Sequence, residues 1–285
     1  MKHRICRIIL CIIVIIIICG LVNIRVNNLE QIEEKCKAAP TKDAVVALCY
    51  HYIREETLWS KLLEELTNSN EIKKYIVYKD EFKWQIDTLI SEGAYFATLE
   101  EVKKFRETGD YPEKCVWICF DDGDESIYKE AFPYLKEKRI PFTIFIIAGQ
   151  VGNQDFNNLK LCTWEQLREM KNSGLVSFGA HTYDMHYLED NKAIFLYKDM
   201  YNPFYRDIKK SKKVIEDNLG IEVTTMAYPF GNTNSKVSQL VQKAGFQEAF
   251  ILAPYAIDSS NDPYSQNRYL VDRKNFYEIF SNWKQ

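Results

Sequence analysis

Short apolar segments alternate with amphipathic helical segments along most of this chain. The apolar segments are residues 45–50, 115–120, 142–147, 175–180, 224–228 and 248–252. Most are apolar on both faces, which is typical of strands buried in a parallel sheet. Helical patterns separate them, at residues 79–92, 98–107, 125–138, 163–173, 203–218 and 234–244. This order predicts an α/β fold with a parallel sheet, and we expect a barrel.

Polar side chains follow four of these strands. The residues at the strand ends are His51, Asp121, Asp122, His181 and His186, together with a Tyr228-Pro229-Phe230-Gly231 turn. Parallel barrels assemble their active sites at the carboxyl ends of the strands. We therefore expect these residues to share one rim of the barrel.

The histidines and aspartates at these strand ends favour a metal site. Two histidines in one short loop can bind the same ion, and a carboxylate completes a His₂Asp set. Taken alone, Asp121-Asp122-Gly123 is also an ordinary turn sequence, and a pair of histidines is often structural. The chain has only four histidines, however, and three of them fall at or just after strand ends. That concentration favours metal-assisted chemistry.

The overall charge excludes one class of function. The formal net charge is -3 and the isoelectric point is about 5.9. Lysine and arginine are scattered among acidic residues, with no basic block beyond the N-terminus. The sequence therefore gives no electrostatic basis for nucleic-acid binding.

The N-terminus predicts a membrane segment. Residues 8–24 are nearly all apolar and would form a helix about 25 Å long, close to the thickness of a bilayer core. Lys2, Arg4 and Arg7 precede the segment, so we expect the N-terminus inside and the rest of the chain outside the cytoplasm. No small-residue cleavage site follows. We expect a signal anchor, with a secreted protein as the alternative if the segment is cleaved.

These features predict four parts of the chain: a cytoplasmic N-terminus at 1–7, a transmembrane anchor at 8–24, a linker at 25–42 and one domain at 43–285. Within that domain, residues 53–78 are charged and partly helical, and we expect an insertion packed on the outside of the barrel. Five cysteines lie beyond the anchor, an odd number without C-x-x-C spacing, and we expect mostly buried thiols.

Three motifs make the resemblance specific. Phe120-Asp121-Asp122-Gly123, the loop from His181 to His186 and the Tyr228–Gly231 turn occur in the order found in polysaccharide deacetylases, also called NodB-homology or carbohydrate esterase family 4 enzymes. Matches to this family extend over residues 45–272. The chain resembles its metal-dependent hydrolases, which implies a distorted (β/α) barrel.

The resemblance also implies roles for individual residues. Asp122, His181 and His186 would bind a divalent metal, zinc by default, and Asp121 would be the general base. Phe230 would offer its backbone N–H to the oxyanion, within a turn fixed by Tyr228, Pro229 and Gly231. Thr182 and Asp184 are candidates to orient the metal ligands. These roles predict hydrolysis of an acetamide.

Three departures narrow the resemblance. The two histidines are five residues apart, Ala227 stands where the family has an arginine beside its base, and no late Leu-x-His motif follows. We therefore expect the base to lack its usual arginine partner and turnover to be low. His51 is the remaining candidate for the general acid, although a structural histidine is the alternative.

The first two departures resemble the subgroup that N-deacetylates poly-β-1,6-N-acetylglucosamine in biofilm exopolysaccharide. Tyr50-His51, Asp262-Pro263-Tyr264 and Arg268-Tyr269-Leu270-Val271 match further stretches of that subgroup. The expected partners are therefore an N-acetylated polysaccharide, the membrane and the machinery that makes or exports the polymer. Peptidoglycan deacetylation and a non-catalytic carbohydrate-binding role are the alternatives.

Overall fold

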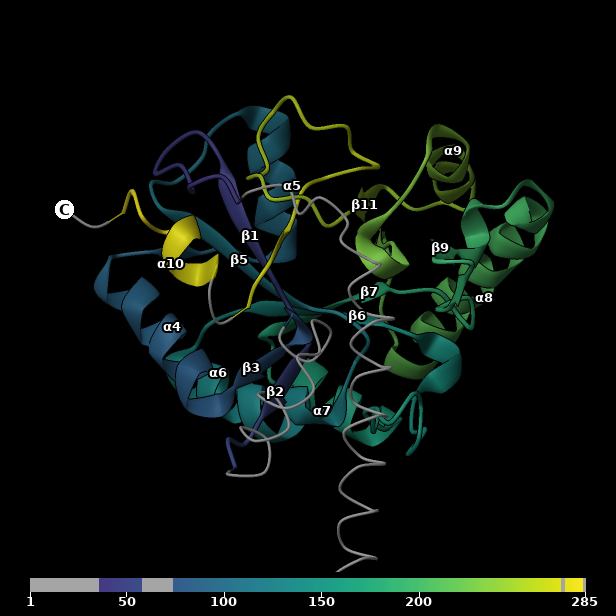
Figure 1. Ribbon diagram of the computed structural model, residues 1–285, viewed down its shortest axis with the longest axis horizontal. Coiled ribbons are helices and arrows are strands. Elements are labelled where there is room, and N and C mark those ends of the chain that lie inside the picture. Colours follow the sequence, from purple (N-terminus) through teal and green to yellow (C-terminus); the bar gives the residue numbers. More distant parts are fainter. Residues whose placement is uncertain (1–35, 58–73, 273–274, 284–285) are drawn as a thin grey trace, which may run out of the picture.

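The computed structural model describes residues 36–57, 74–272 and 275–283 (Figure 1). The predicted anchor at 8–24 lies outside these residues, as do the N-terminus and most of the linker. Within the described part of the chain, no helix is both long enough and apolar enough to cross a membrane.

A curved parallel sheet forms the centre of the molecule. Its strands in spatial order are β11 (Glu248–Phe250), β10 (Thr225–Ala227), β7 (Val176–Ala180), β6 (Phe142–Ile146), β5 (Cys115–Phe120), β1 (Val45–Tyr50) and β12 (Tyr269–Leu270), and β4 (Tyr95–Phe96) pairs with β5. The six predicted strands are confirmed, some of them shorter than expected. The long strands β1, β5 and β6 are buried because side chains pack on both faces of the sheet.

The two edges of the sheet are linked by the end of the chain. Gln266 forms a parallel bridge with Phe250 in β11, and Ile251 donates its N–H to the Gln266 carbonyl at 2.9 Å. A few residues later, Tyr269 in β12 pairs with Leu48 in β1. This segment therefore runs from one edge of the sheet to the other. The arrangement is consistent with the predicted distorted barrel.

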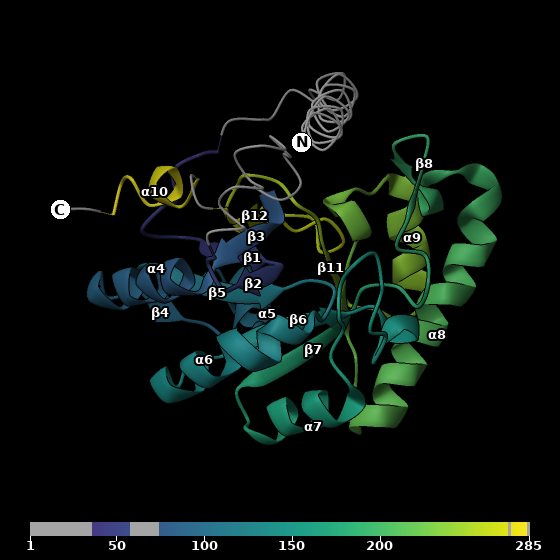
Figure 2. The ribbon, with the colours of Figure 1, turned by 60° about the horizontal axis from the view of Figure 1, so that its bottom comes forward.

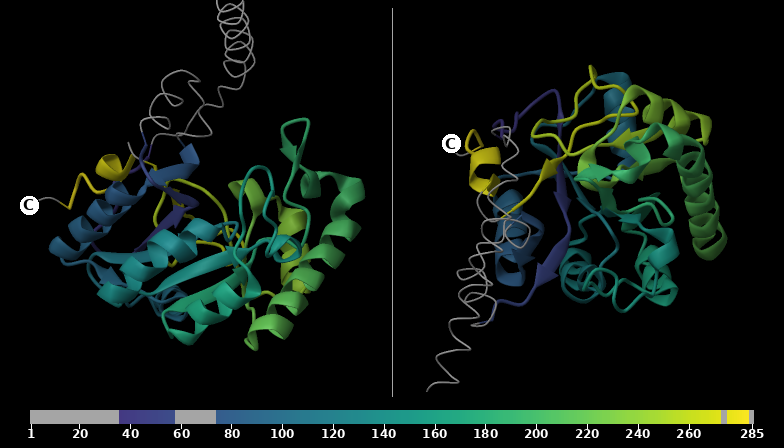
Figure 3. Two further views of the ribbon diagram at one scale, coloured as in Figure 1. Left: turned by 90° about the horizontal axis from the view of Figure 1, so that it is seen from below. Right: turned by 45° about the vertical axis from the view of Figure 1, so that its right-hand side comes forward.

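Helices surround the sheet, as Figures 1 and 2 show. Those described are α4 (Lys79–Ser91), α5 (Leu99–Thr108), α6 (Phe132–Lys138), α7 (Trp164–Asn172), α8 (Tyr201–Leu219), α9 (Ser235–Lys243) and α10 (Asn275–Ile279). The helix predicted at 125–138 begins as a π-helical turn at Ile127–Ala131 before α6. Two further views show the same ring of helices around the strands (Figure 3).

Local sequence explains where several helices begin and end. Thr98 and Glu101 form a capping box at the start of α5, and Thr163 and Gln166 do the same for α7. Gly109, in the left-handed conformation, ends α5. These caps fix the ends of the helices that alternate with the strands of the sheet.

The apolar strands pack against different neighbours on their two faces. In β1, Val46, Leu48 and Tyr50 join a large cluster with most of the helices. Val45, Ala47 and Cys49 alternate with them and belong to a second cluster that includes α5. Four cysteines are buried free thiols and Cys36 is partly buried, as the sequence predicted.

Residues 53–78 were expected to be a partly helical insertion, and most of the part expected to be helical lies outside the described residues. The two ends of this segment form β2 (Tyr52–Arg54) and β3 (Ile76–Tyr78), which pair in parallel. Residues 58–73 between them are outside the described part of the chain. A second small sheet, antiparallel, joins β8 (Leu188–Glu189) to β9 (Lys192–Ala193). The sequence did not predict these short strands because each has only two or three residues.

Candidate functional site

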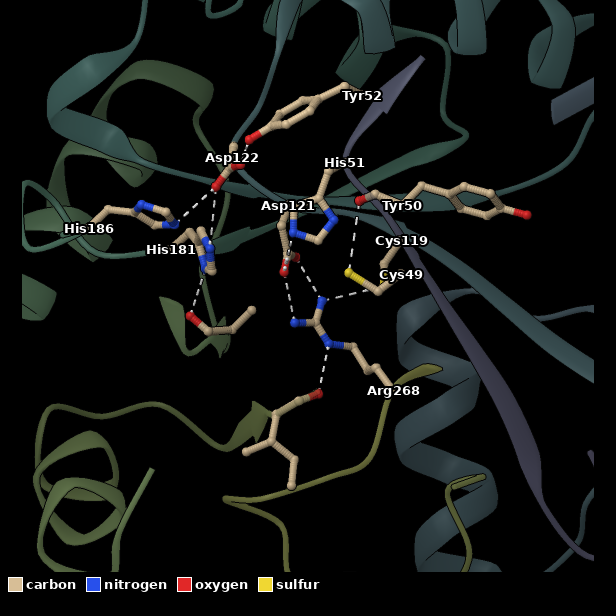
Figure 4. Close-up of polar contacts among 12 residues, drawn as sticks. Cys49, Tyr50, His51, Tyr52, Cys119, Asp121, Asp122, His181, His186 and Arg268 are labelled. Atoms are coloured by element: carbon tan, nitrogen blue, oxygen red, sulfur yellow. Dashed lines mark hydrogen bonds and ion pairs between the residues drawn. The ribbon is translucent and has the colours of Figure 1, made fainter. Parts of the chain in front are cut away.

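The predicted metal ligands meet at the edge of the sheet where the carboxyl ends of β5 and β7 lie, with β6 between these two strands (Figure 4). Asp122 follows β5, whereas His181 follows β7 and His186 lies in the loop beyond it. The Asp122 Oδ1 atom is 3.5 Å from His181 Nε2 and 3.2 Å from His186 Nε2. One oxygen and two nitrogens, all within 4.8 Å of one another, form a group that could hold a metal ion.

The protonation of His181 supports a cation at this place. Its Nδ1 lies 2.9 Å from the Ala227 carbonyl, which can only accept, so Nδ1 carries the proton. Burial lowers the pKa of His181 to about 4, and the ring is therefore neutral at physiological pH. Its Nε2 lone pair then points toward a carboxylate oxygen. Two such acceptors are held together favourably only by a cation between them.

Asp122 gives a second indication. Its Oδ1 is buried and accepts no hydrogen bond from the described residues, although two imidazole nitrogens are close. Burial acts to raise the pKa of Asp122, but the charge of His186 outweighs it and holds the pKa well below its usual range. A buried, ionised carboxylate is costly unless a cation lies beside it; protonated His186 is that cation in this structure, and a metal ion would take the place of its proton. The residues present therefore fit a divalent metal.

Tyr52 orients this carboxylate. Its hydroxyl donates to Asp122 Oδ2 at 2.7 Å. Burial and the Asp122 charge both raise the pKa of Tyr52, so the phenol keeps the proton that it donates. With Oδ2 bonded to Tyr52, Oδ1 is the oxygen that faces the histidines.

Backbone and side-chain contacts fix the strand that carries Tyr52. In β2, Arg54 forms a two-pronged ion pair with Asp124, at 2.6 and 3.0 Å. Ile53 donates its N–H to the Ser126 hydroxyl at 3.0 Å. These bonds attach β2 to the loop that follows β5, and so they fix Tyr52 relative to Asp122.

Asp121, the predicted base, pairs with an arginine that sequence reasoning did not assign. Arg268 donates to Asp121 Oδ1 at 2.7 Å and to Oδ2 at 2.9 Å. The expectation that the base lacks an arginine partner was therefore wrong. Arg268 comes from the segment before β12. It pairs with Asp121, as the family's arginine does from the position that Ala227 has in this chain. The premise for low turnover is removed with it.

This pair sets the charge of Asp121. Burial acts to raise the pKa of Asp121, but the Arg268 charge, supported by His181, lowers it to about 2. Arg268 is itself fully buried, donates from Nε to the Ile251 carbonyl at 3.3 Å, and lies over the Phe145 ring at 5.1 Å. The guanidinium is thus fixed in place, and Asp121 is ionised throughout the neutral range.

His51 lies beside Asp121. The distance from His51 Nε2 to Asp121 Oδ2 is 4.0 Å, and the His51 ring is 4.7 Å from the ring of Tyr75. Burial lowers the pKa of His51, although the two aspartates oppose it. The imidazole is therefore neutral at rest. The structure places this residue, as predicted, on the same rim as the Asp and His ligands.

One side chain of the Tyr228–Gly231 turn, that of Phe230, lies against the loop that carries His186. Phe230 has a φ of 61° and its ring lies 4.7 Å from that of His186. Pro229 is buried, and the Tyr228 hydroxyl donates to the Tyr264 carbonyl at 3.0 Å. Gly231 has a φ of 70°, and a Cβ there would lie 2.4 Å from the Leu252 Cβ. The turn is therefore tightly specified, with Tyr228 directed away from the metal ligands.

The two candidates for orienting the ligands lie in different surroundings. Thr182 is buried next to His181 and has a φ of 70°. Asp184 is exposed and accepts a hydrogen bond from Gln150 at 2.5 Å. The contacts that orient Asp122 and His181 come instead from Tyr52 and the Ala227 carbonyl. Sequence reasoning missed Tyr52, although it follows His51 directly.

A curved parallel sheet with a buried Asp–Arg pair beside an Asp-His-His group is typical of hydrolases of the metal-assisted class. Comparison with known proteins gives the family. The sequence model described as polysaccharide deacetylase matches residues 108–249. The chain belongs to the polysaccharide deacetylase family and is an enzyme of that family.

Three similar proteins can be aligned with most of the chain. A poly-beta-1,6-N-acetyl-D-glucosamine N-deacetylase of Staphylococcus epidermidis is 37% identical over 257 residues, which is 90% of this chain and 89% of that protein. The protein of the same name from Staphylococcus aureus is 36% identical, covering 85% and 83%. The solved structure of IcaB from Ammonifex degensii has a TM-score of 0.77 at 30% identity, covering 87% of this chain and 100% of that one.

Proposed function

We propose that this enzyme removes N-acetyl groups from poly-β-1,6-N-acetylglucosamine. The observation that carries the proposal is the Asp122-His181-His186 group beside the Asp121–Arg268 pair, in a chain that shares 37% identity with an enzyme named for that reaction. The reaction hydrolyses an amide, giving acetate and a free amine on the sugar.

The three ligands would hold a divalent metal, with zinc as the default. When bound, such an ion polarises the acetamide carbonyl and activates a water molecule. Neutral His181 and ionised Asp122 are already in the protonation states that a metal needs. His186 must lose a proton first, because its pKa is raised. We propose that these residues form the metal site.

Asp121 would take the proton from the attacking water. Its low pKa keeps it ionised, and Arg268 holds its two oxygens in one orientation. The attack places negative charge on the former carbonyl oxygen. The backbone N–H of Phe230, in a turn fixed by Pro229 and Gly231, would donate to that oxygen.

His51 would deliver the proton that the departing amine needs. Because its pKa is lowered, it starts neutral and must gain this proton during turnover. Asp121 Oδ2, 4.0 Å away, would supply the proton taken from water. The transfer then balances: water gives one proton to the amine through the two residues, and its hydroxyl goes to the acetyl carbon.

The localisation is part of the same proposal. Residues 8–24 would anchor the chain in the membrane, with residues 43–285 on the extracytoplasmic side, where the polymer and its export machinery are found. The support is the apolar segment preceded by Lys2, Arg4 and Arg7. Proteolysis of intact cells should then degrade the domain and leave a membrane-bound N-terminal fragment.

The activity is tested with defined oligomers. The full chain in detergent is incubated with β-1,6-linked and β-1,4-linked N-acetylglucosamine oligomers, and free amine is measured. We expect faster release from the β-1,6-linked oligomer and a loss of about 10²-fold or more in Asp121→Asn. Release from neither oligomer, or equal rates in the variant, would refute the proposal.

A further inference from the structure

A second group of potential metal ligands includes the two residues proposed above as the base and the acid. The Cys49 Sγ, an imidazole nitrogen of His51 and a carboxylate oxygen of Asp121 are all within 4.8 Å of one another. Cys49 and Asp121 are fully buried and His51 is 7% exposed. The group contains none of the three ligands of the first site, and Figure 4 shows Cys49, His51 and Asp121 on the Arg268 side of the centre.

His51 has one ring nitrogen without a hydrogen-bond partner among the described residues. This nitrogen, Nδ1, is buried. A buried imidazole nitrogen without a partner costs free energy, and a ligand that it could bind would remove that cost. The Cys49 thiol makes a long contact, 3.8 Å, to the Tyr50 carbonyl, and it also lies against Cys119 on the neighbouring strand. Both side chains therefore have ligand atoms that an ion could bind.

The ligand types select a class of ion. Thiolate, imidazole and carboxylate together suit zinc and the softer cadmium, whereas magnesium and calcium prefer oxygen alone. In a tetrahedral zinc site the ligand atoms lie about 2.0 to 2.3 Å from the metal. From spacings of up to 4.8 Å, the ligand atoms would have to approach one another by about 1 Å on binding. A water molecule would be the fourth ligand.

Arg268 sets the relative strength of this site. Its guanidinium uses two of the about four lone-pair positions of Asp121, so positions for an ion remain. Its positive charge nevertheless repels a second cation, and burial raises the pKa of the Cys49 thiol, so a proton must be displaced. We expect this group to bind more weakly than Asp122, His181 and His186.

We propose that Cys49, His51 and Asp121 form a second, inhibitory site for a thiophilic divalent cation, filled when such an ion is in excess. Occupancy would make the base and the acid into ligands, so that neither could carry a proton. This consequence depends on the catalytic roles proposed above for Asp121 and His51. The binding itself depends only on the geometry of the group.

Cadmium is the probe for this site. The full chain in detergent, loaded with one equivalent of zinc, is titrated with cadmium chloride. Bound metal is counted after dialysis, thiolate-to-cadmium charge transfer is followed by ultraviolet absorption, and acetate release is measured. The first site has no cysteine, and the part of the absorption that is lost when Cys49 is replaced reports on the second site. We expect a second equivalent, a new absorption band and a rate lowered by at least about tenfold.

Variants at two cysteines separate the possibilities. In Cys49→Ala and Cys49→Ser the band and the second equivalent should disappear, and each variant should keep its own starting rate in excess cadmium. Cys115→Ala is the matched control, because Cys115 is a buried thiol in the same core cluster, at the other end of the neighbouring strand. It should behave like the unmodified chain. Unfolding temperatures show whether each variant is folded, and the serine variant avoids the cavity of the alanine variant.

The results distinguish this inference from the proposed function. One bound equivalent in excess cadmium, or a band that persists without Cys49, would overturn the second site even if acetate release is normal. A Cys49-dependent band in a chain that releases no acetate would keep the site and refute the deacetylase. Inhibition that is equal in the Cys49 variants would mean that cadmium acts at the first site, and would also overturn the inference.

Discussion

The Arg268 guanidinium bonds both carboxylate oxygens of Asp121, at 2.7 and 2.9 Å, with both side chains buried. Two-pronged pairs of this kind are the strongest hydrogen-bonded ion pairs in proteins. The pair has two consequences, one for the stability of the fold and one for the charge of Asp121, the proposed base.

Removal of the guanidinium should affect both properties. Arg268→Leu leaves a buried carboxylate unpaired, so we expect a loss of about 3–5 kcal/mol in the free energy of unfolding. Burial then acts on Asp121 without its main opponent, so the pKa of Asp121 rises. The base becomes protonated at higher pH, and the acid limb of kcat/KM should move upward in pH. Denaturant unfolding and a pH–rate profile measure the two effects.

The double variant Arg268→Leu/Asp121→Asn is the control for stability. It removes the unpaired charge and should recover most of the lost free energy while staying inactive. An unchanged acid limb in Arg268→Leu would show that the arginine does not set the charge of the base.

Sequence reasoning located the metal group but not this pair, for a physical reason. Asp122, His181 and His186 each lie at or close to the end of a strand that is apolar on both faces, and parallel strands bring such ends together. Arg268 follows no strand and is 147 residues from Asp121. Only the path of the final segment, from β11 to β1, brings it to the base. The resemblance marked Arg268-Tyr269-Leu270-Val271 without giving the arginine a partner.

The fold, too, has parts that a local sequence pattern predicts and parts that depend on distant segments of the chain. The strands at 45–50 and 115–120 could be predicted because each is a run of six apolar residues, and the structure buries all of them. The strands at either end of 53–78 could not, because each has three residues and is stabilised by a neighbour far along the chain. Tyr52 belongs to the first of these strands. Its role depends on tertiary pairing that no local pattern records.

Tyr52→Phe should weaken metal binding. The substitution removes the hydroxyl that fixes Asp122 Oδ2, and loss of such a bond typically costs about 10- to 100-fold in metal affinity. Competition with a chromophoric chelator measures the dissociation constant directly. Tyr128→Phe is the control, since Tyr128 donates to Glu169 at 2.6 Å in another carboxylate bond away from the site. Equal affinities for the Tyr52 variant and the unmodified chain would contradict the role.

His51→Gln should lose activity but keep the first metal. General acid–base catalysis contributes about 10²- to 10⁴-fold, and we expect a fall in kcat of that order. The metal content after dialysis should stay at that of the unmodified chain, because His51 is outside the Asp122-His181-His186 group. A variant that loses both metal and activity would indicate a structural histidine.

Metal affinity should rise with pH. Burial acts to lower the pKa of His186, but the Asp122 charge outweighs it and raises the pKa above 6.5. Binding requires the neutral imidazole, so below this pKa each pH unit should strengthen binding by about tenfold, with release of about one proton. His181 has a pKa of about 4 and adds nothing in this range. Titration calorimetry in buffers of different ionisation enthalpy counts the protons, and a pH-independent affinity would exclude the assignment.

Gly231→Ala should distort the turn that carries Phe230. The new Cβ would lie 2.4 Å from the Leu252 Cβ and 2.6 Å from the Leu252 N, and the φ of 70° adds strain for any side chain. Gly152→Ala is the matched control, because Gly152 has a φ of 80° with nothing within 4 Å of an added Cβ. Both variants should lose about 1–2 kcal/mol from the left-handed backbone, and Gly231→Ala about 1–3 kcal/mol more from the clash. Only Gly231→Ala should also lower kcat, because the Leu252 clash displaces the Phe230 N–H from the reacting oxygen. Equal stability and equal kcat in the two variants would mean that the turn yields to the methyl group and does not position the oxyanion.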